Sequence, residues 1–349
     1  MTLTTRQQAI LDIVRRTGPV ATRDIRTALA ETNESVTRLT VIRDLDALVR
    51  AKLVLRSGKG RAVRYGEVVR NASQRFIDPV SYFALEDDRR GAATAFRIDA
   101  LDAFSDTFTA GEMAKILSLN EAYRRRKRSL SPGVIRKEME RFTAEFSWKS
   151  SQIEGNTYSL LDTEVLLTQR QEAAGHPHAE AQMILNHKTA LDFVAAHPRD
   201  YAALTVRTVE QLHALIIKDL GVAKGLRNAP VGILGTEYRP LRLRSQIREA
   251  LLETTKLING EPFAPAKALI ALLMIAYIQP FEDGNKRTAR LLGNAFLIAA
   301  DFCPLSYRSI DEKEYKKAVV LFYEQNNVRY FKQLFLEQFA YATGHYFLS

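Results

Sequence analysis

The chain has 349 residues, of which 46% are hydrophobic and 26% are charged, a composition typical of a globular protein long enough for two domains. Its single cysteine excludes an internal disulfide, and its net charge is +10. No apolar run approaches the ~20 residues that span a membrane, and the first residues lack the apolar core of a signal peptide. We therefore expect a cytoplasmic protein with no membrane partner.

The positive charge is concentrated at the amino-terminal end. Residues 1–70 contain 14 Lys and Arg against 7 Asp and Glu, a balance of 14 − 7 = +7, which leaves 10 − 7 = +3 for the other 279 residues. A basic segment of this size is the electrostatic footprint of a nucleic-acid-binding domain, although charge alone is weak evidence.

The same seventy residues carry the pattern of a small helical domain. Apolar spacing predicts one helix around residues 10–14, a second around 25–30, and a third that begins near Ser35 or Thr37 and continues to Val49. Residues 53–65 then predict two short strands around a Gly-Lys-Gly turn. Three helices followed by a basic hairpin are typical of a winged helix-turn-helix domain.

The third predicted helix resembles the recognition helix of DeoR-type bacterial regulators over residues 40–48, with Ile42 and Arg43 where paired arginines are usual. The resemblance implies that double-stranded DNA is the partner. The residues expected to contact DNA are Arg38, Thr40 and Arg43 on the helix and Lys59 and Arg61 on the wing. The alternative is a small domain that binds proteins and has a solvated basic face.

The middle of the chain is less informative. Residues 71–110 have mixed polarity and no long periodic run, so we interpret them as a connector. A cationic run at 124–128 is more typical of a solvated helix face than of a binding site. A turn at Ser131-Pro132-Gly133 precedes a long predicted helix over 134–148. The second domain is then expected to cover 111–349.

The most informative segment is the loop Gln-Pro-Phe-Glu-Asp-Gly-Asn-Lys-Arg at residues 279–287. It follows the apolar run 268–278 and precedes a second helical pattern. A Gly- and Asn-containing loop that opens a helix binds anions, because unpaired N–H groups and the helix dipole both favour negative charge. Asp283, just before the glycine, is suited to hold a Mg²⁺ ion that bridges two phosphates.

This loop resembles the signature of the Fic (Fic/Doc) family, which transfers nucleotidyl groups to protein hydroxyls. The resemblance implies a helical domain that uses ATP or another nucleoside triphosphate with Mg²⁺ bound by Asp283. It assigns nucleotide binding to Gly284, Asn285, Lys286, Arg287 and Arg290. Lys286 replaces the second glycine of the commonest signature, as in Doc-type relatives, which transfer phosphate.

A second resemblance concerns the segment from Ser150 to Gly155, which is similar to the inhibitory motif of Fic proteins. In that family the glutamate, here Glu154, pairs with the second arginine of the signature, here Arg290, and blocks productive placement of the γ-phosphate. A carboxylate in an anion site competes with phosphate for the same donors. The alternative is a glutamate that ends a helix beside a Gly-Asn cap.

Residues 225–240 contain short β-prone pieces broken by Gly and Pro, which predict a small β-hairpin in an otherwise helical domain. In Fic proteins this segment is a flap that clamps a target peptide as an added strand. The residues expected to contact the target protein are Val231, Gly232, Ile233, Leu234 and Gly235.

Gln279 occupies the position of the catalytic histidine of the Fic signature. That histidine accepts the proton of the attacking hydroxyl, whereas an amide does not titrate near neutral pH and can only position the hydroxyl. Loss of a general base typically costs about 10²–10⁴-fold in rate. None of the chain's histidines lies within the signature.

The sequence thus predicts a mainly α protein with two functional alternatives. One is a DNA-binding transcriptional regulator whose Fic domain binds nucleotide, and a peptide, with weak or absent AMP transfer. The other is a self-inhibited adenylyltransferase or phosphotransferase that modifies a Tyr, Thr or Ser hydroxyl. A homodimer is expected in either case, since Fic proteins associate through helices and a dimer suits a two-half-site operator.

Overall fold

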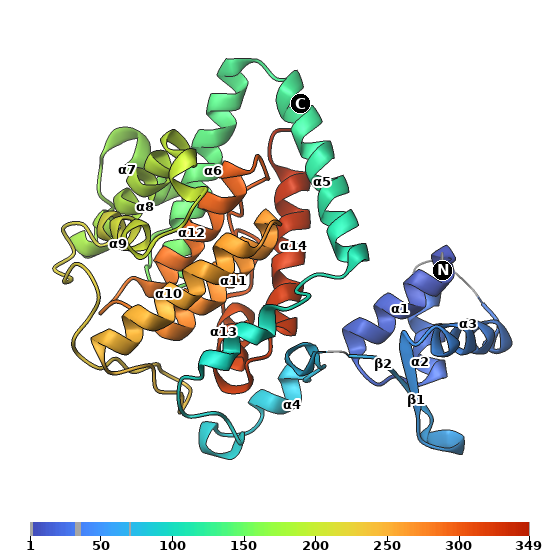
Figure 1. The fold of residues 1–349 in the computed structure, drawn as a ribbon. Helices are drawn as coiled ribbons and strands as arrows, with labels where there is room; N and C mark the ends of the chain where they lie inside the picture. The colour runs from blue at the N-terminus through green and yellow to red at the C-terminus, as the bar shows by residue number, and fades with distance from the viewer. Residues whose placement is uncertain (1–2, 32–35, 70, 349) are drawn as a thin grey trace. The chain divides into compact units, whose positions relative to one another are not determined.

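The computed structural model describes residues 3–31, 36–69 and 71–348, which form a mainly helical protein (Figure 1). The chain divides into two compact units, Met1–Glu86 and Asp87–Ser349, and the division falls within the expected connector 71–110. Residues 87–110 cluster with the second unit.

The first unit contains three helices and a two-stranded antiparallel ladder in the expected order. These elements are α1 (Thr5–Thr17), α2 (Thr22–Glu31), α3 (Arg38–Arg50), β1 (Val54–Ser57) and β2 (Arg64–Glu67), with Val54 opposite Glu67 and Ser57 opposite Arg64. Thr37 caps α3, as predicted, while the alternative start at Ser35 lies outside the described residues. A core of Ile, Leu and Val side chains from all three helices holds the unit together.

Local signals explain where the first helix starts and stops. Thr4 and Gln7 form a reciprocal capping box at the start of α1, which satisfies two backbone donors that the helix itself leaves unpaired. Gly18, with φ of 71°, ends the helix in a conformation that favours glycine. The short helices η1 (Gly60–Ala62), η2 (Ala72–Gln74) and α4 (Pro79–Phe83) complete the unit.

The second unit is built around two adjacent helices, α11 (Ala264–Ile278) and α12 (Asn285–Ala299), which lie side by side in Figure 1. Every residue from Ala268 to Ile278 is buried, as expected for a helix that is apolar on all sides. The helices that enclose this pair are α5 (Ala110–Ser129), α6 (Pro132–Gln152), α7 (Leu160–Gln169), α8 (His178–Ala196), α9 (Val206–Ile216), α10 (Arg244–Gly260), α13 (Glu312–Gln325) and α14 (Arg329–His345), with the short helices η3 (Asp87–Arg89), η4 (Ile98–Phe104) and η5 (Pro198–Tyr201).

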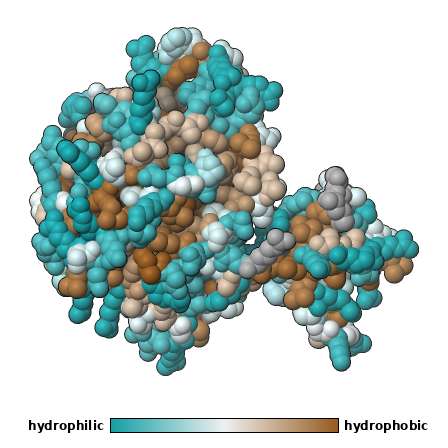
Figure 2. Space-filling view, viewed as in Figure 1, coloured by the Kyte–Doolittle hydropathy of each residue, from teal (hydrophilic) through white to brown (hydrophobic). Residues whose placement is uncertain are grey.

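The interior of the second unit also contains polar groups, and α12 carries several of them. Asn285, Arg287, Thr288, Arg290 and Asn294 are all buried on this helix. Buried charges and amides require partners, so the face of α12 that carries them indicates a built polar site within the apolar core. The face drawn in Figure 2 is mostly hydrophilic, with scattered apolar patches. Within the described part of the chain, no helix is long and apolar enough to cross a membrane.

Candidate nucleotide-binding site

The loop between α11 and α12 leaves the start of α12 open for a ligand. Gln279 ends α11 in the left-handed region, and Gly284 precedes α12 with φ of 79° and no side-chain cap. A Cβ at Gly284 would lie 3.0 Å from Cγ2 of Ile217, so only glycine fits both the conformation and the space. The first amide groups of α12 therefore face outward, as anion binding requires.

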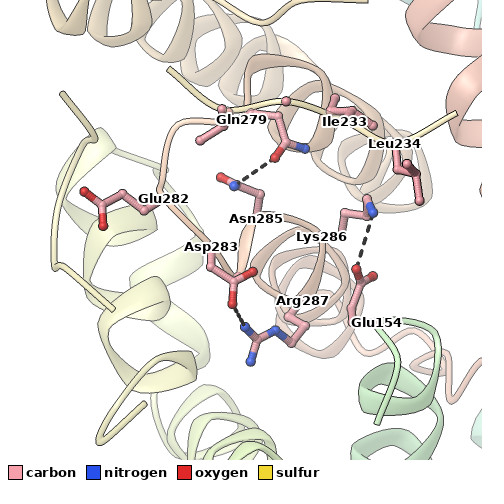
Figure 3. Close-up of a pocket in the computed structure, with 12 residues that line it drawn as sticks. Glu154, Ile233, Leu234, Gln279, Glu282, Asp283, Asn285, Lys286 and Arg287 are labelled. Carbon is pink, nitrogen blue, oxygen red and sulfur yellow. Dashed lines mark hydrogen bonds and ion pairs between the residues drawn. The ribbon is translucent and has the colours of Figure 1, made fainter. Parts of the chain in front are cut away.

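Side-chain hydrogen bonds fix the shape of this loop. The amide oxygen of Asn285 accepts from the Phe281 N–H at 2.9 Å, and its Nδ2 donates to the Phe281 carbonyl at 2.9 Å. The same Nδ2 donates to Oε1 of Gln279 at 2.9 Å, as Figure 3 shows. Phe281 is buried and stacks on His213 with ring centroids 3.6 Å apart. Asn285, predicted to bind the nucleotide, lines the pocket, and all three of its side-chain bonds lie within the loop.

Gln279 is held by the protein on both sides of its amide. Its Nε2 donates to the Ala276 carbonyl at 2.6 Å, and its Oε1 accepts from Asn285. The side chain is buried but still borders the pocket. It carries no group that can accept a proton from a hydroxyl near neutral pH.

Arg287 provides a buried cation with an unused donor. Its side chain is only 2% exposed, and its Nη2 donates to Oδ2 of Asp283 at 2.7 Å. Its Nη1 is buried and has no hydrogen-bond partner among the described residues. An orphaned guanidinium donor next to open amide groups is the arrangement expected of a site that binds phosphate.

The donor set suits a metal ion that arrives with a nucleotide. Among the residues that the structure describes, no group of three or more His, Cys, Asp and Glu could hold a metal. Mg²⁺ commonly binds one or two carboxylates and completes its shell with phosphate oxygens and water. Asp283 fits this role, because its side chain is 66% exposed and lines the pocket.

Glu154 lies across the same site, immediately after the end of α6. Its Oε1 accepts from Nη1 of Arg290 at 2.9 Å. Its Oε2 accepts from Nζ of Lys286 at 3.3 Å, as Figure 3 shows. Burial raises the pKa of Glu154, but the charges of Arg290 and Lys286 outweigh it and hold that pKa below its ordinary value. Glu154 is therefore an anion bound by two cations of the loop helix.

Ser150 holds Arg290 in place for its pairing with Glu154, and His187 in turn contacts Ser150. Arg290 donates from Nε to Ser150 Oγ at 2.9 Å and from Nη2 to the Ser150 carbonyl at 2.7 Å. His187 Nε2 lies 2.9 Å from Ser150 Oγ, and its Nδ1 lies 2.9 Å from the Met183 carbonyl. Since Nδ1 must donate to that carbonyl, Nε2 accepts from the serine. Burial lowers the pKa of His187 to about 3, so the ring stays neutral.

These elements surround a pocket of about 200 Å³. It is lined by the residues Glu154, Val231, Gly232, Ile233, Leu234, Gln279, Glu282, Asp283, Gly284, Asn285, Lys286 and Arg287. The structure thus brings the predicted loop, the predicted inhibitory glutamate and most of the predicted flap to one place. Gly235 lies outside the lining, and Ser150 and Arg290 are buried behind it.

The flap differs from the expected β-hairpin. Residues 225–240 contain no strand ladder, and the segment has one isolated bridge, between Arg239 and Ala95. The reason is an arginine that replaces cross-strand pairing. Arg227 is buried and donates to the carbonyls of Ala229 (2.9 Å), Leu241 (2.5 Å) and Gln279 (2.6 Å), which closes the base of the flap and ties it to the loop.

The far limb of the flap is held by the first residues of the second unit. Arg90 donates to the Gly235 carbonyl at 3.1 Å and pairs with Glu324 of α13 at 3.3 Å. Arg239 donates its N–H to the Thr94 carbonyl at 3.0 Å. The tip of the flap lies between the Arg227 contacts at its base and these contacts on its far limb. At this tip Leu234 is 98% exposed above the pocket.

In the first unit the predicted DNA-contacting residues are accessible. Arg38, Arg43, Lys59 and Arg61 are exposed, and Thr40 is half-buried with its hydroxyl 2.9 Å from that of Thr37. The exposed stripe of α3 also contains Leu39 and Asp46. Charge on this face is therefore basic but mixed.

Comparison with known proteins agrees with the geometry of the pocket. Residues 203–297 match the model of the Fic/DOC family, and the chain therefore contains a Fic/DOC family domain.

The chain is similar to proteins named protein adenylyltransferase Fic. It is 26% identical over 172 residues to that of Nematostella vectensis, covering 48% of this chain and 40% of the relative. It is 28% identical over 182 residues to that of Drosophila melanogaster, covering 50% of this chain and 36% of the relative. The chain thus spans well under half the length of these relatives.

Solved structures show the same fold. Fic-1 from C. elegans superposes with a TM-score of 0.59 at 20% identity, covering 67% of this chain and 71% of that one. A Fic domain-containing signaling protein from Bacteroides thetaiotaomicron superposes with a TM-score of 0.56 at 20% identity, covering 66% of this chain and 95% of that one. At this level of identity the likeness concerns the fold.

Proposed function

We propose that the second unit binds a nucleoside triphosphate, with Asp283 holding its Mg²⁺, and that Glu154 holds the site in a self-inhibited state. The observation that carries the proposal is the orphaned Nη1 of Arg287 beside the open start of α12, with a carboxylate already bound by the neighbouring cations. The bound ion would neutralise charge on the phosphates and on the leaving group.

The names of the similar proteins suggest transfer of AMP to a protein hydroxyl as the reaction. We propose that this transfer is weak in the present chain. Gln279 cannot take the proton of the hydroxyl. Two other titratable side chains, Glu154 and His213, are no better suited as the base. Glu154 has a lowered pKa and two cationic partners. Burial lowers the pKa of His213 to about 4, and its Nε2 is already bonded to the Asp283 carbonyl at 2.9 Å.

Calorimetric titration with MgATP tests the binding proposal. Glu154→Ala removes the competing carboxylate, and since hydrogen bonds to charged groups contribute about 1.5–3 kcal/mol, ATP affinity should rise by about 10-fold or more. Glu164→Ala is the matched control, because Glu164 is exposed on α7 and does not line the pocket. Absence of ATP binding by Glu154→Ala up to millimolar nucleotide would refute the proposal.

A second proposed function, DNA binding, concerns the first unit alone. It is favoured by three helices and a hairpin in winged-helix order, with Arg38, Arg43, Lys59 and Arg61 exposed. Protein bound to its own upstream DNA would be detected by a mobility shift at moderate salt. In the double variant Lys59→Ala/Arg61→Ala, the slope of log affinity against log salt concentration should fall by the value of about one phosphate contact for each residue. No shift at moderate salt, or an unchanged salt slope, would count against it.

We also propose two further properties for testing: an active transferase, as the alternative function, and a homodimer. Activity would be seen as transfer of label from ATP, tested with α- and γ-labelled nucleotide separately so that AMP transfer and phosphate transfer are distinguished. Sedimentation equilibrium would report the oligomeric state.

A further inference from the structure

Lys286 has a contact that the commonest Fic signature, with glycine at this position, cannot make. It sits in the first turn of α12, and its Nζ lies 3.3 Å from Oε2 of Glu154 while Arg290 holds Oε1. Its side chain is 27% exposed, so the ammonium group is partly shielded from water but still open to the pocket. Each oxygen of the carboxylate is therefore bound by a different cation.

We infer that Lys286 has two opposed roles: it helps to hold Glu154 in the blocking position, and it binds the terminal phosphate of the nucleotide when Glu154 leaves. The inference rests on the proposed nucleotide binding and deepens it. A carboxylate bound by two cations through separate oxygens occupies the place of a phosphate group, which offers oxygens of the same charge at similar spacing. The anion that displaces Glu154 takes over both cations.

The structure favours this double role over either role alone. A pure clamp would not need to reach the ligand space, whereas Lys286 lines the pocket. A pure phosphate ligand would be free in the absence of nucleotide, but Lys286 is already paired with Glu154. Arg290 is anchored to Ser150 and cannot follow the ligand. Lys286, with its flexible stem, can move from one anion to the other.

The double role predicts a pattern of changes in the Kd for MgATP that a double-mutant cycle can detect. With Glu154 present, Lys286→Ala removes a phosphate contact and also loosens the block, so the two effects offset and the Kd for MgATP should change by less than about 3-fold. With Glu154→Ala only the phosphate contact is lost, and the Kd should rise by about 10-fold. MgADP, which lacks the terminal phosphate, should show less than about 3-fold change in the same background.

The experiment is calorimetric titration of the full chain with MgATP and MgADP for wild type, Lys286→Ala, Glu154→Ala and the double variant. Lys286→Arg should retain the wild-type pattern, because it keeps the charge. Lys316→Ala is the matched control, since Lys316 is an exposed lysine on α13 outside the pocket. Equal melting temperatures of the variants would show that folding is preserved.

Two outcomes would overturn the inference while leaving nucleotide binding intact. An equal loss of affinity in both backgrounds would make Lys286 a phosphate ligand without a clamping role. No loss in the Glu154→Ala background would make it a clamp alone. By contrast, failure of Glu154→Ala to bind MgATP at all would refute the proposed function itself.

Discussion

Replacing Gln279 with histidine should convert a binding site into a transferase site. The backbone accepts the change, because Gln279 has φ of 49° and histidine is among the residues that tolerate the left-handed region. The partner groups accept it as well. A histidine N–H can take over the donation that Nε2 of Gln279 now makes to the Ala276 carbonyl at 2.6 Å, which leaves the other ring nitrogen to accept the hydroxyl proton.

The expected gain follows from the chemistry of general bases. A positioned base typically contributes about 10²–10⁴-fold, so Gln279→His should raise the rate of AMP transfer by roughly that factor once Glu154 is removed. With Glu154 in place the gain should be smaller, because its carboxylate occupies Arg290 and Lys286.

The assay is transfer of label from α-labelled ATP to protein, including the protein itself, with Glu154→Ala and the double variant Glu154→Ala/Gln279→His compared at equal concentration. Gln279→Ala in the same background controls for loss of the amide. The reasoning is refuted if Glu154→Ala alone transfers label as fast as the double variant. It is equally refuted if the double variant binds MgATP tightly and transfers nothing when a hydroxyl-bearing peptide is supplied in excess.

Three further predictions concern stability and the flap. Between pH 6.5 and 5, His187 alone should cost the protein roughly 2 kcal/mol of unfolding free energy, measured by denaturant titration. The reason is that the folded pKa of His187, about 3, lies below the ordinary 6.5, so the unfolded state gains the proton first. His187→Gln should flatten this dependence of stability on pH, whereas His178→Gln, at an exposed site, should not. Gly284→Ala should lower stability by about 1–3 kcal/mol, seen as a lower melting temperature, since its Cβ meets Ile217 at 3.0 Å in a left-handed backbone; an unchanged melting temperature would contradict the role given to this glycine. Arg90→Ala should speed hydrogen exchange of the amides in residues 231–237 severalfold without affecting α12, whereas Arg89→Ala, exposed at the neighbouring position, should leave the flap as it is; uniform loss of protection across the unit would mean a general folding defect instead.

Much of the helical framework could be predicted because its signals are local. The apolar run 268–278 predicted a buried helix, and Thr37 and Gly18 marked real helix ends. The flap shows where local signals fail. Its β-prone pieces predicted a hairpin, but Arg227 satisfies the carbonyls that a partner strand would have used. Nothing in the sequence around Arg227 indicates which carbonyls it will reach.

The site itself was predictable as a set of motifs but not as a network. Glu154 and Arg290 are separated by 136 positions, and only the resemblance of both segments to one family predicted that they meet. The supports behind them were missed. His187 lies in no recognisable motif, yet it is a buried neutral ring that accepts from Ser150. Such a role depends on the packing of α6 against α8, which no spacing rule reports.

The position of Glu154 just beyond the end of α6 determines how the proposed inhibition would respond to nucleotide concentration. Ser150 and the helix stay fixed to Arg290, so the carboxylate can leave by side-chain rotation while the rest of the site keeps its shape. Glu154 then behaves as a tethered competitor whose effective concentration is on the order of millimolar or more. Under the proposed inhibition, rising nucleotide concentration would displace the carboxylate continuously, with a midpoint raised by that effective concentration.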